Sequence, residues 1–349
     1  MSTTTTARRA RIAVLLVVAA LAVGEVLLRA TADPRALAAT ADPELGWLLR
    51  PNHDAELEGA RVRTNSAGFR GPEWDTPTHA DHADDGVLRL AVLGDSVAFG
   101  FGVEYEQLFG AQLERRLAAA LGEGRVEVRN YALPGKCWSQ MRGIHERYVT
   151  PWEPDVVIVM LNDSSHRPPM PIKPRAWSQE LLARSALYAA WEASLELGPE
   201  LELWSTPPVR SQAWRRSFDC QRFPFALRNR EHFLAMADDL VDLRAELDDR
   251  GAELLLAALP LHAHFGEHPD RRLGLFFNMH AGQLGLPLID PAERFHAWAR
   301  RHAGRPGANP QPVFGADLFL PDDPGHWSPE AHALMADVLA EALLASREP

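Results

Sequence analysis

RLAVLGDSVAFGFG, residues 89–102, is the stretch from which the architecture of this chain can be read. The apolar run Leu90 to Leu93 is closed by Gly94-Asp95-Ser96, which is typical of a buried parallel strand that ends in a turn. A serine at the carboxyl end of such a strand lies at the edge where open α/β sheets hold their ligands. If a helix begins there, the Ser96 amide is a free donor that can stabilise developing negative charge. Taken alone, Gly-Asp-Ser is equally a plain strand-to-helix cap.

Strand-like and helix-like segments alternate along the rest of the chain. Such alternation predicts an α/β fold, a doubly wound parallel sheet with helices on both faces. We expect strands at 89–94, 125–130, 155–161, 253–259 and 286–290. We expect helices near 105–121, 138–149, 230–250, 270–284 and 291–302, and a final helix whose buried face holds positions 331, 334, 335, 338 and 339.

Two more strand ends carry groups that suit an oxyanion. Gly135 closes the segment NYALPG and offers an N–H that no side chain shields. Asn162 ends the apolar run DVVIVMLND, and its carboxamide can donate to negative charge. The plainer interpretations are a turn glycine after Pro134 and a helix cap at Asn162-Asp163.

A histidine close to the C-terminus can supply a base. His326 lies on a loop before SPEAHALMADVLAEAL, in which Ser328 and Glu330 indicate a helix start. Asp323, three residues upstream, can fold back to orient the imidazole. The adjacent Asp322 is the alternative carboxylate, although the three-residue spacing favours Asp323. A plain surface turn is the remaining interpretation.

Taken in order, these segments resemble the sequence blocks of the SGNH/GDSL hydrolase superfamily over roughly residues 60–345. The resemblance implies the three-layer, flavodoxin-like fold of that superfamily. It implies Ser96 as nucleophile, His326 as general base and Asp323 as the residue that orients the histidine. It also implies an oxyanion hole formed by the Ser96 and Gly135 amides and the Asn162 side chain. This serine machinery needs no metal and no cofactor.

Two positions depart from the superfamily pattern. Val97 stands where the leucine of GDSL is usual, and Met160 replaces the glycine two residues before the asparagine, which would reshape the pocket floor. Neither change removes a chemical group.

The N-terminus differs in kind from the rest of the chain. Three arginines within residues 8–11 precede the apolar stretch Ile12 to Leu28. A positive flank before about 17 apolar residues is typical of a signal peptide or a single membrane anchor. Because bulky and charged residues follow instead of a small-residue cleavage site, we expect residues 1–30 to form a cytoplasmic tip and an uncleaved transmembrane helix. The N-terminus would be cytoplasmic and the catalytic domain would lie outside the cytoplasmic membrane. The alternatives are a cleaved signal peptide, which leaves a secreted or periplasmic protein, and a buried soluble helix, which the nearly absent polar face disfavours.

The length and the net charge of the chain limit its domain organisation and its possible partners. The 349 residues, 46% of them hydrophobic, can bury one large core or two modest ones. We expect an extracytoplasmic lead-in at 31–86, in which Asn65 to Arg70 packs on the sheet edge, and the hydrolase domain at 87–349. The net charge of −11 is spread through the chain, which predicts a solvated acidic surface and argues against a nucleic-acid partner.

An insertion at about 164–228 interrupts the alternation directly after Asn162-Asp163, so we expect it to lie over the catalytic face as a cap. Tryptophans in the cap can stack on sugar rings, line an acyl pocket or form a small core of their own. They are Trp177, Trp191, Trp204 and Trp214.

Three histidines near the expected site are candidate substrate contacts: His166 in the cap, and His262 and His264 after the fourth core strand. A metal held by His262, His264 and His268 is the alternative, as it is for the loop HADHADDG at 79–86. A solvated loop fits better because that loop lacks the fixed ligand spacing of a metal site.

Cys137 and Cys220 are too few for a disulfide scaffold. Outside the cytoplasm they can pair and tether the later segment near Gly135, or remain two small unpaired apolar residues.

These features predict an extracytoplasmic serine esterase that acts on short-chain esters, such as acetyl groups on carbohydrate. One alternative is an O-acyltransferase that passes the acyl group to a cell-surface glycan. It is disfavoured because the serine comes first and Asp-His last, the ordinary hydrolase order. The other alternative, a non-catalytic glycan-binding module, is disfavoured because no catalytic group is missing. The sequence does not indicate an oligomeric state.

Overall fold

The computed structural model of this chain describes residues 3–31, 39–74, 85–169, 229–265, 285–286, 288–302, 315–321, 323 and 325–347. The chain divides into two units. In the first, the structure describes one long helix, α1 (Thr3–Thr31), and every other described element belongs to the second. Among the residues described, no helix combines the length and apolar character needed to cross a membrane.

The second unit is built on a five-stranded parallel sheet. Its strands are β5 (Leu88–Leu93), β6 (Val126–Asn130), β7 (Val156–Leu161), β8 (Glu253–Ala258) and β9 (Leu288–Ile289). Their spatial order is β6-β5-β7-β8-β9. The chain leaves β5 for a neighbour on one side and then returns to its other side, so the switch point of the sheet lies at the carboxyl end of β5. The predicted α/β class and parallel sheet are confirmed.

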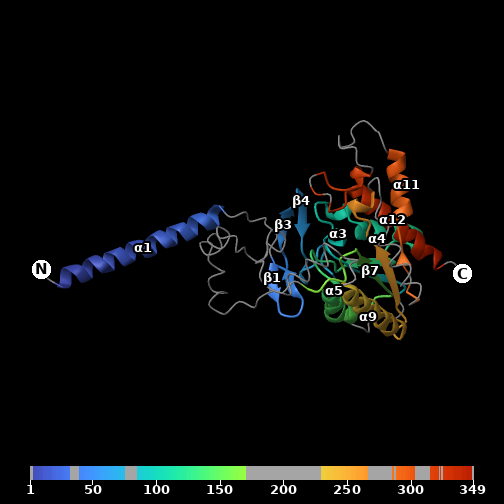
Figure 1. The fold of residues 1–349 in the computed structure, drawn as a ribbon, viewed down its shortest axis with the longest axis horizontal. Coiled ribbons are helices and arrows are strands. Elements are labelled where there is room, and N and C mark those ends of the chain that lie inside the picture. The colour runs from blue at the N-terminus through green and yellow to red at the C-terminus, as the bar shows by residue number, and fades with distance from the viewer. Residues whose placement is uncertain are drawn as a thin grey trace. The chain divides into compact units, whose positions relative to one another are not determined.

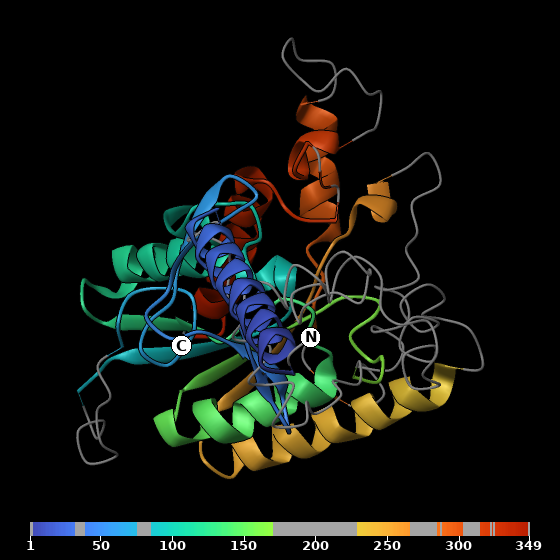
Figure 2. The ribbon, with the colours of Figure 1, turned by 90° about the vertical axis from the view of Figure 1, so that its left-hand side faces the viewer.

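Helices cover both faces of this sheet (Figures 1 and 2). On one face α4 (Phe109–Leu121) packs against α12 (Pro329–Ala345), and α11 (Ala292–His302) contacts α12. On the other face lie α5 (Trp138–Ile144) and α9 (Arg230–Asp248). The strands between these layers are therefore buried on both sides, which explains why β7 is wholly apolar and fully buried along its length.

The ends of several helices and strands differ from the predicted ones. The helix expected from residue 105 starts as a 3₁₀ turn at Tyr105–Gln107, and the α-helix begins only at Phe109. The helix expected over 138–149 ends at Ile144 and continues as one π turn, His145–Val149. The strand expected at 286–290 is described only at Leu288–Ile289, where it pairs with β8. The helix expected near 270–284 lies outside the described residues.

The final helix starts where predicted, with one difference at its cap. Ser328 is the N-cap residue, but its hydroxyl donates to the Asp317 carbonyl (2.7 Å) instead of accepting from the first turn. The apolar face is buried as expected, except that Val338 is half-buried. His332, which the apolar pattern did not include, is fully buried on the same helix.

The lead-in folds into two antiparallel hairpins, β1 (Ala39–Asp42) with β2 (Gly46–Leu49) and β3 (Asp54–Leu57) with β4 (Ala60–Arg63). The segment that follows was expected on the sheet edge. Phe69 does contact Tyr131, just beyond edge strand β6 (ring centroids 5.1 Å apart). Arg70 instead reaches past the edge, and its guanidinium is buried under the loop that follows Ser96.

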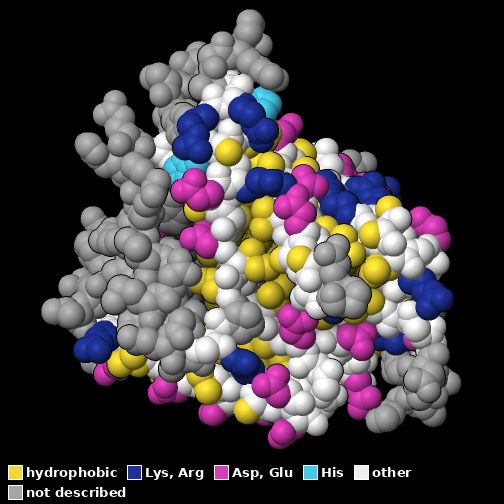
Figure 3. All heavy atoms as spheres, turned by 90° about the vertical axis from the view of Figure 1, so that its right-hand side faces the viewer, with side chains coloured by type: hydrophobic (Ala, Val, Ile, Leu, Met, Phe, Trp, Pro, Cys, Tyr) yellow, Lys and Arg dark blue, Asp and Glu magenta, His cyan; other side chains and the backbone are white. Residues whose placement is uncertain are grey.

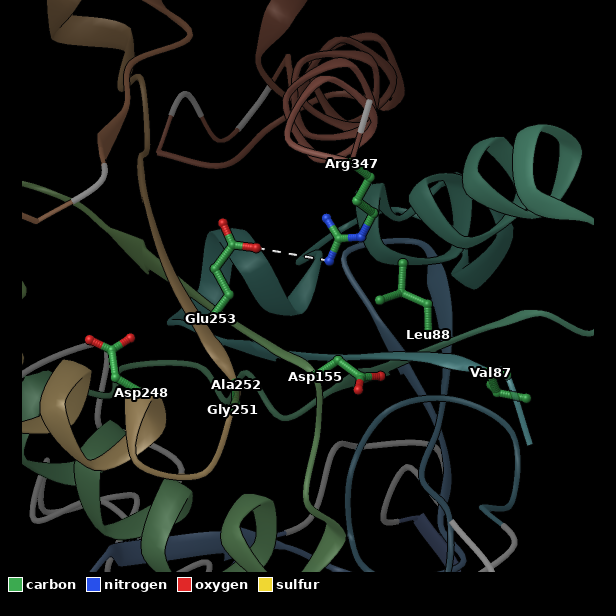
Figure 4. Close-up of a pocket in the computed structure, with 9 residues that line it drawn as sticks. Val87, Leu88, Asp155, Asp248, Gly251, Ala252, Glu253 and Arg347 are labelled. Atoms are coloured by element: carbon green, nitrogen blue, oxygen red, sulfur yellow. Dashed lines mark ion pairs between the residues drawn. The ribbon is translucent and has the colours of Figure 1, made fainter. Parts of the chain in front are cut away.

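The amino ends of the strands surround an open hollow of about 660 Å³ (Figure 4). It is lined by Leu88, Asp155, Asp248, Glu253 and Arg347, and Glu253 pairs with Arg347 at 3.8 Å. The hollow lies at the opposite edge of the sheet from Ser96, because Leu88 begins the strand that Ser96 follows. On the face drawn in Figure 3, acidic and basic side chains are interspersed.

His332 ties α12 to the start of α4. Its Nδ1 accepts the Phe109 amide (3.3 Å), and its ring stacks on that of Phe109. Burial lowers the pKa of His332 to about 3, so the folded protein holds this imidazole neutral.

We predict that the free energy of unfolding falls as the pH drops from about 6.5 towards 3. The unfolded chain takes up a proton at His332 in this window and the folded chain does not, at a cost approaching about 1.4 kcal/mol per pH unit. His332→Asn keeps an acceptor for the Phe109 amide and cannot titrate. Urea unfolding between pH 7 and pH 5 should therefore show a shallower pH dependence in the variant. Equal slopes in variant and wild type would contradict this account.

Candidate active site

Ser96 lies at a sharp turn from β5 into the short helix α3 (Ser96–Phe99). Asp95 is the N-cap, and its Oδ1 accepts the Val97 amide (3.0 Å). Gly94 has to lack a side chain, because an added Cβ would lie 2.4 Å from the Cβ of Ala98. As the first residue of a helix, Ser96 has an N–H without an intrahelical acceptor.

The loop that carries His326 is held by a short ladder of backbone hydrogen bonds. The Leu320 amide donates to the His326 carbonyl (3.0 Å), and the Ser328 amide donates to the Leu318 carbonyl (3.0 Å). The indole of Trp327 donates to the Pro260 carbonyl (2.8 Å), just beyond β8. The histidine is thereby fixed to the carboxyl edge of the sheet, the edge at which Ser96 lies.

Ser96, His326 and Asp323 form a hydrogen-bonded series. Nε2 of His326 lies 2.8 Å from Oγ of Ser96, and Nδ1 lies 2.5 Å from Oδ2 of Asp323. The predicted neighbour Asp322 is outside the described residues, and Asp323 makes the contact. An imidazole bonded to a hydroxyl on one side and to a carboxylate on the other can accept the hydroxyl proton while the carboxylate stabilises the imidazolium.

The Asn162 side chain is held in one orientation next to this series. Its Oδ1 accepts from the amide (2.8 Å) and hydroxyl (2.9 Å) of Ser164 and from the hydroxyl of Ser165 (3.3 Å). Its Nδ2 donates to Oδ2 of Asp95. A carboxamide nitrogen carries two hydrogens, so one Nδ2 hydrogen remains for a substrate oxygen.

Gly135 has a positive φ of 67°, a conformation that side chains disfavour. Its carbonyl accepts from the buried guanidinium of Arg167, and the Leu133 amide donates to the Gly94 carbonyl (3.2 Å). The next residue, Lys136, is buried, with Nζ donating to the carbonyls of Leu45 (2.8 Å) and Trp47 (2.5 Å). The Gly135 loop is thus tied both to β5 and to the β1–β2 hairpin.

Burial shifts two pKa values beside the site. Desolvation raises the pKa of Asp95, against the lowering effect of the Val97 amide and of the His326 and Arg167 charges. Desolvation lowers the pKa of Lys136 to about 7. Both groups therefore lie in an environment that weakens ionisation and strengthens hydrogen bonds.

Two of the histidines predicted to contact the substrate pack edge-on against phenylalanine rings. His166 is buried with its ring edge against Phe233 of α9 (centroids 5.8 Å apart). His262 is half-buried, edge-on to Phe319 (5.2 Å), and the side chain of His264 is outside the described residues. Within the described ranges, no three potential metal-ligating side chains are grouped.

The structure describes some of the other residues that the sequence singles out, and the rest lie outside the described ranges. Cys137 is a buried free thiol in the described part of the chain, whereas Cys220 and the cap tryptophans lie outside it. Val97 and Met160 are both buried, and Met160 sits in β7 beneath Gly94.

Sequence reasoning missed the polar groups that brace the site. Asn130 donates from Nδ2 to the Ala98 carbonyl (2.9 Å) and accepts the Ala132 amide (3.0 Å), which joins the loops after β5 and β6. Asp95 holds Asn162, and Arg70 holds the backbone after α3. Asn130 and Asp95 each lie at the carboxyl end of a core strand, a position that was visible in the sequence.

A serine bonded to an imidazole that is bonded to a carboxylate, at the switch edge of a doubly wound sheet, defines the class of serine hydrolases. Residues 92–285 match the GDSL-like Lipase/Acylhydrolase family. The chain belongs to this family and is a serine hydrolase that acts on ester bonds. The predicted resemblance to the SGNH/GDSL superfamily is confirmed.

The chain is similar to a solved lipase/acylhydrolase from Enterococcus faecalis, at 14% identity and a TM-score of 0.42, covering 75% of this chain and 98% of that one. The acetyl xylan esterase AlAXEase has 14% identity and a TM-score of 0.42, with 73% and 100% covered. LAE5, an alpha/beta hydrolase from the metagenome of Lake Arreo, Spain, has 16% identity and a TM-score of 0.44, with 75% and 97% covered. No curated protein matches the chain.

We predict that Asn162→Ala lowers kcat by about 10²- to 10³-fold with little change in KM, because an oxyanion donor acts mainly in the transition state. Steady-state kinetics on a short p-nitrophenyl ester measure both constants, and thermal unfolding reports the loss of the Oδ1 contacts. A variant that loses stability but keeps near wild-type kcat would reduce Asn162 to a turn cap.

Proposed function

We propose that this protein is a serine esterase whose nucleophile is Ser96, whose general base is His326 and whose orienting carboxylate is Asp323. The supporting observation is the pair of hydrogen bonds that His326 makes, 2.8 Å to Ser96 and 2.5 Å to Asp323. A serine hydroxyl is a weak nucleophile without a base, and this imidazole is within proton-transfer distance of it.

In the first half-reaction Oγ of Ser96 attacks the ester carbonyl while Nε2 of His326 takes the hydroxyl proton. The carbonyl oxygen becomes an oxyanion, stabilised by the amides of Ser96 and Gly135 and the second Nδ2 hydrogen of Asn162. The tetrahedral intermediate collapses, His326 returns its proton to the leaving alcohol, and an acyl-enzyme remains.

In the second half-reaction His326 deprotonates a water molecule, which attacks the acyl-enzyme. The same donors hold the second oxyanion, and the acid leaves as Ser96 regains its proton. The Asp323 carboxylate stabilises the imidazolium that forms in each step.

For the substrate, we propose a short-chain ester, such as an acetyl group on a carbohydrate. The support is the sequence of the insertion at about 164–228, which leaves directly from Asn162 and holds four tryptophans, side chains that stack well on sugar rings. In this proposal His166, His262 and His264 contact the substrate. The competing function is O-acyl transfer to a glycan, in which a sugar hydroxyl replaces water in the second half-reaction.

We further propose, from the sequence of residues 1–30, that this segment anchors the enzyme in the cytoplasmic membrane with the catalytic unit on the outer side. The described part of α1 does not by itself have the length and apolar character of a membrane-spanning helix. The exposed large apolar side chains of α1 between Ile12 and Leu27 are 48–67% exposed, whereas the most exposed large apolar residues described in the second unit, Leu121 and Leu234, are 40% and 37% exposed. Apolar surface of this extent is costly in water, and arginines precede it at the N-terminal end. A signal peptide that is removed after export is the competing role.

We predict that the full-length protein fractionates with membranes and that removal of residues 1–30 releases it into the soluble fraction. N-terminal sequencing of the fractionated protein distinguishes the two roles of α1. A mature protein that begins near residue 30 and is free in the extracytoplasmic fluid would replace the anchor with a cleaved signal.

We predict that Ser96→Ala and His326→Ala each abolish most ester hydrolysis, and that the double variant is scarcely slower than either single variant, because these residues act as a unit. A fluorophosphonate probe should label Ser96 in the wild type and label neither variant.

Asp323→Asn should keep the fold and lose activity, whereas Asp322→Asn is the matched control and should remain active. A folded wild type that resists the probe and hydrolyses no short ester would favour a glycan-binding module, and acyl products that appear only with a sugar acceptor would favour the transferase.

A further inference from the structure

The His326 imidazole has a third neighbour besides Ser96 and Asp323. The Phe101 ring stacks on it, with centroids 4.3 Å apart and planes inclined by 17°. The two hydrogen bonds hold the imidazole at its two nitrogens. They leave the ring free to rotate about the line that joins Nδ1 and Nε2. A flat ring lying parallel to the imidazole restrains that rotation, so this contact controls the direction in which Nε2 points.

Phe101 is held between two glycines that the packing requires. Gly100 has a φ of 81°, and a Cβ there would lie 1.7 Å from Cδ2 of Leu108. Gly102 has a φ of 73°, and a Cβ there would lie 2.4 Å from Cδ1 of Leu320. Leu320 is the residue whose amide binds the His326 carbonyl, so the Phe101 loop packs directly on the loop that carries the histidine.

The guanidinium of Arg70 holds this loop through hydrogen bonds to its backbone. It donates to the carbonyls of Phe99 (3.2 Å), Gly100 (2.5 Å) and Val103 (2.5 Å), which bracket Phe101 on both sides. A further bond reaches the Arg61 carbonyl (3.0 Å) in β4. Arg70 is buried, and although burial lowers its pKa to about 10, it stays cationic at neutral pH.

We propose that Arg70 and Phe101 are positioning residues for catalysis: Arg70 holds the loop at 99–103, and Phe101 in that loop sets the plane of the His326 imidazole. Neither side chain exchanges a proton in the reaction. The inference rests on the proposed function, in which His326 is the general base. It assigns the lead-in segment ending at Arg70, which precedes the sheet, to the support of the active site.

The direct test is the kinetics of Phe101→Leu in the full-length protein. The variant keeps apolar volume but loses the flat ring, so we expect kcat on a short p-nitrophenyl ester to fall about tenfold or more, with KM within about twofold. The rate of fluorophosphonate labelling at Ser96 should fall by a similar factor. Phe101→Tyr restores a flat ring and should restore kcat.

A matched control exists elsewhere in the molecule. Trp298 stacks on His302 with centroids 3.9 Å apart and planes inclined by 16°, so Trp298→Leu removes a stack of the same kind outside the site. This variant should have wild-type kcat. Equal losses in Trp298→Leu and Phe101→Leu would show a general effect of lost packing and would overturn the proposal.

Arg70→Lys tests the other half of the proposal. A single ammonium group cannot span three carbonyls as the planar guanidinium does, so kcat should fall while KM changes little. If both residues act on the same loop, the double variant with Phe101→Leu should be no slower than the slower single variant. Thermal unfolding checks that Arg70→Lys is folded, and the Phe101 series stands without it.

The outcomes separate this inference from the proposed function. If Ser96→Ala and His326→Ala lose activity while Phe101→Leu keeps wild-type kcat, the positioning role is wrong and the esterase mechanism stands. A rise in KM at constant kcat in Phe101→Leu would make Phe101 a substrate contact and would also overturn the positioning role. If Ser96→Ala and His326→Ala remain active, the proposed function itself fails.

Discussion

The hydrogen bond between Ser96 and His326 joins residues 230 positions apart, and most of the fold can be understood as the means of holding it at 2.8 Å. Ser96 arrives on β5, which is buried on both faces and paired on both sides, so the strand has little freedom to move. His326 arrives on a loop whose backbone is paired with residues 318–320 and whose neighbour Trp327 is bonded to the chain beyond β8. Proton transfer requires both partners at hydrogen-bond distance, and neither irregular loop could maintain it without the sheet.

The loops at this edge of the sheet are held together mainly by buried polar groups that bind backbone. Asn130 joins the loop after β6 to α3, Arg167 and Lys136 fix the Gly135 loop, and Arg70 binds the loop after α3. Apolar packing alone positions loops poorly, because it is not directional, whereas a buried donor without an acceptor is costly. Each of these side chains therefore selects one loop conformation, which is the kind of support a catalytic group requires.

The local signals in the sequence were strong where the chain is regular. Apolar runs at 89–94 and 155–161 predicted the two central strands to within a residue, because strands buried on both faces must be almost wholly apolar. Prediction was weaker at the ends of elements and at isolated buried polar residues. The start of α4 was placed four residues early, since the capping box at Glu104 and Gln107 closes a separate 3₁₀ turn, and the two-residue edge strand β9 was overestimated. His332 escaped the apolar pattern because the partner that makes its burial tolerable, the Phe109 amide, lies 223 positions away.

For the candidate site, the sequence by itself determined the chemical groups and their order: a serine and an asparagine at the carboxyl ends of apolar strands, a glycine in a turn, and a histidine three residues after an aspartate. These are local patterns, and the physics that produces them acts over a few residues. The tertiary structure alone decided which orientation each group takes. That Asn162 turns its nitrogen to Asp95, that Phe101 lies flat on His326, and that Arg70 reaches the loop after α3 depend on contacts between segments 29 to 225 positions apart. Such contacts form only when the whole sheet has assembled, and no pattern within one segment encodes them.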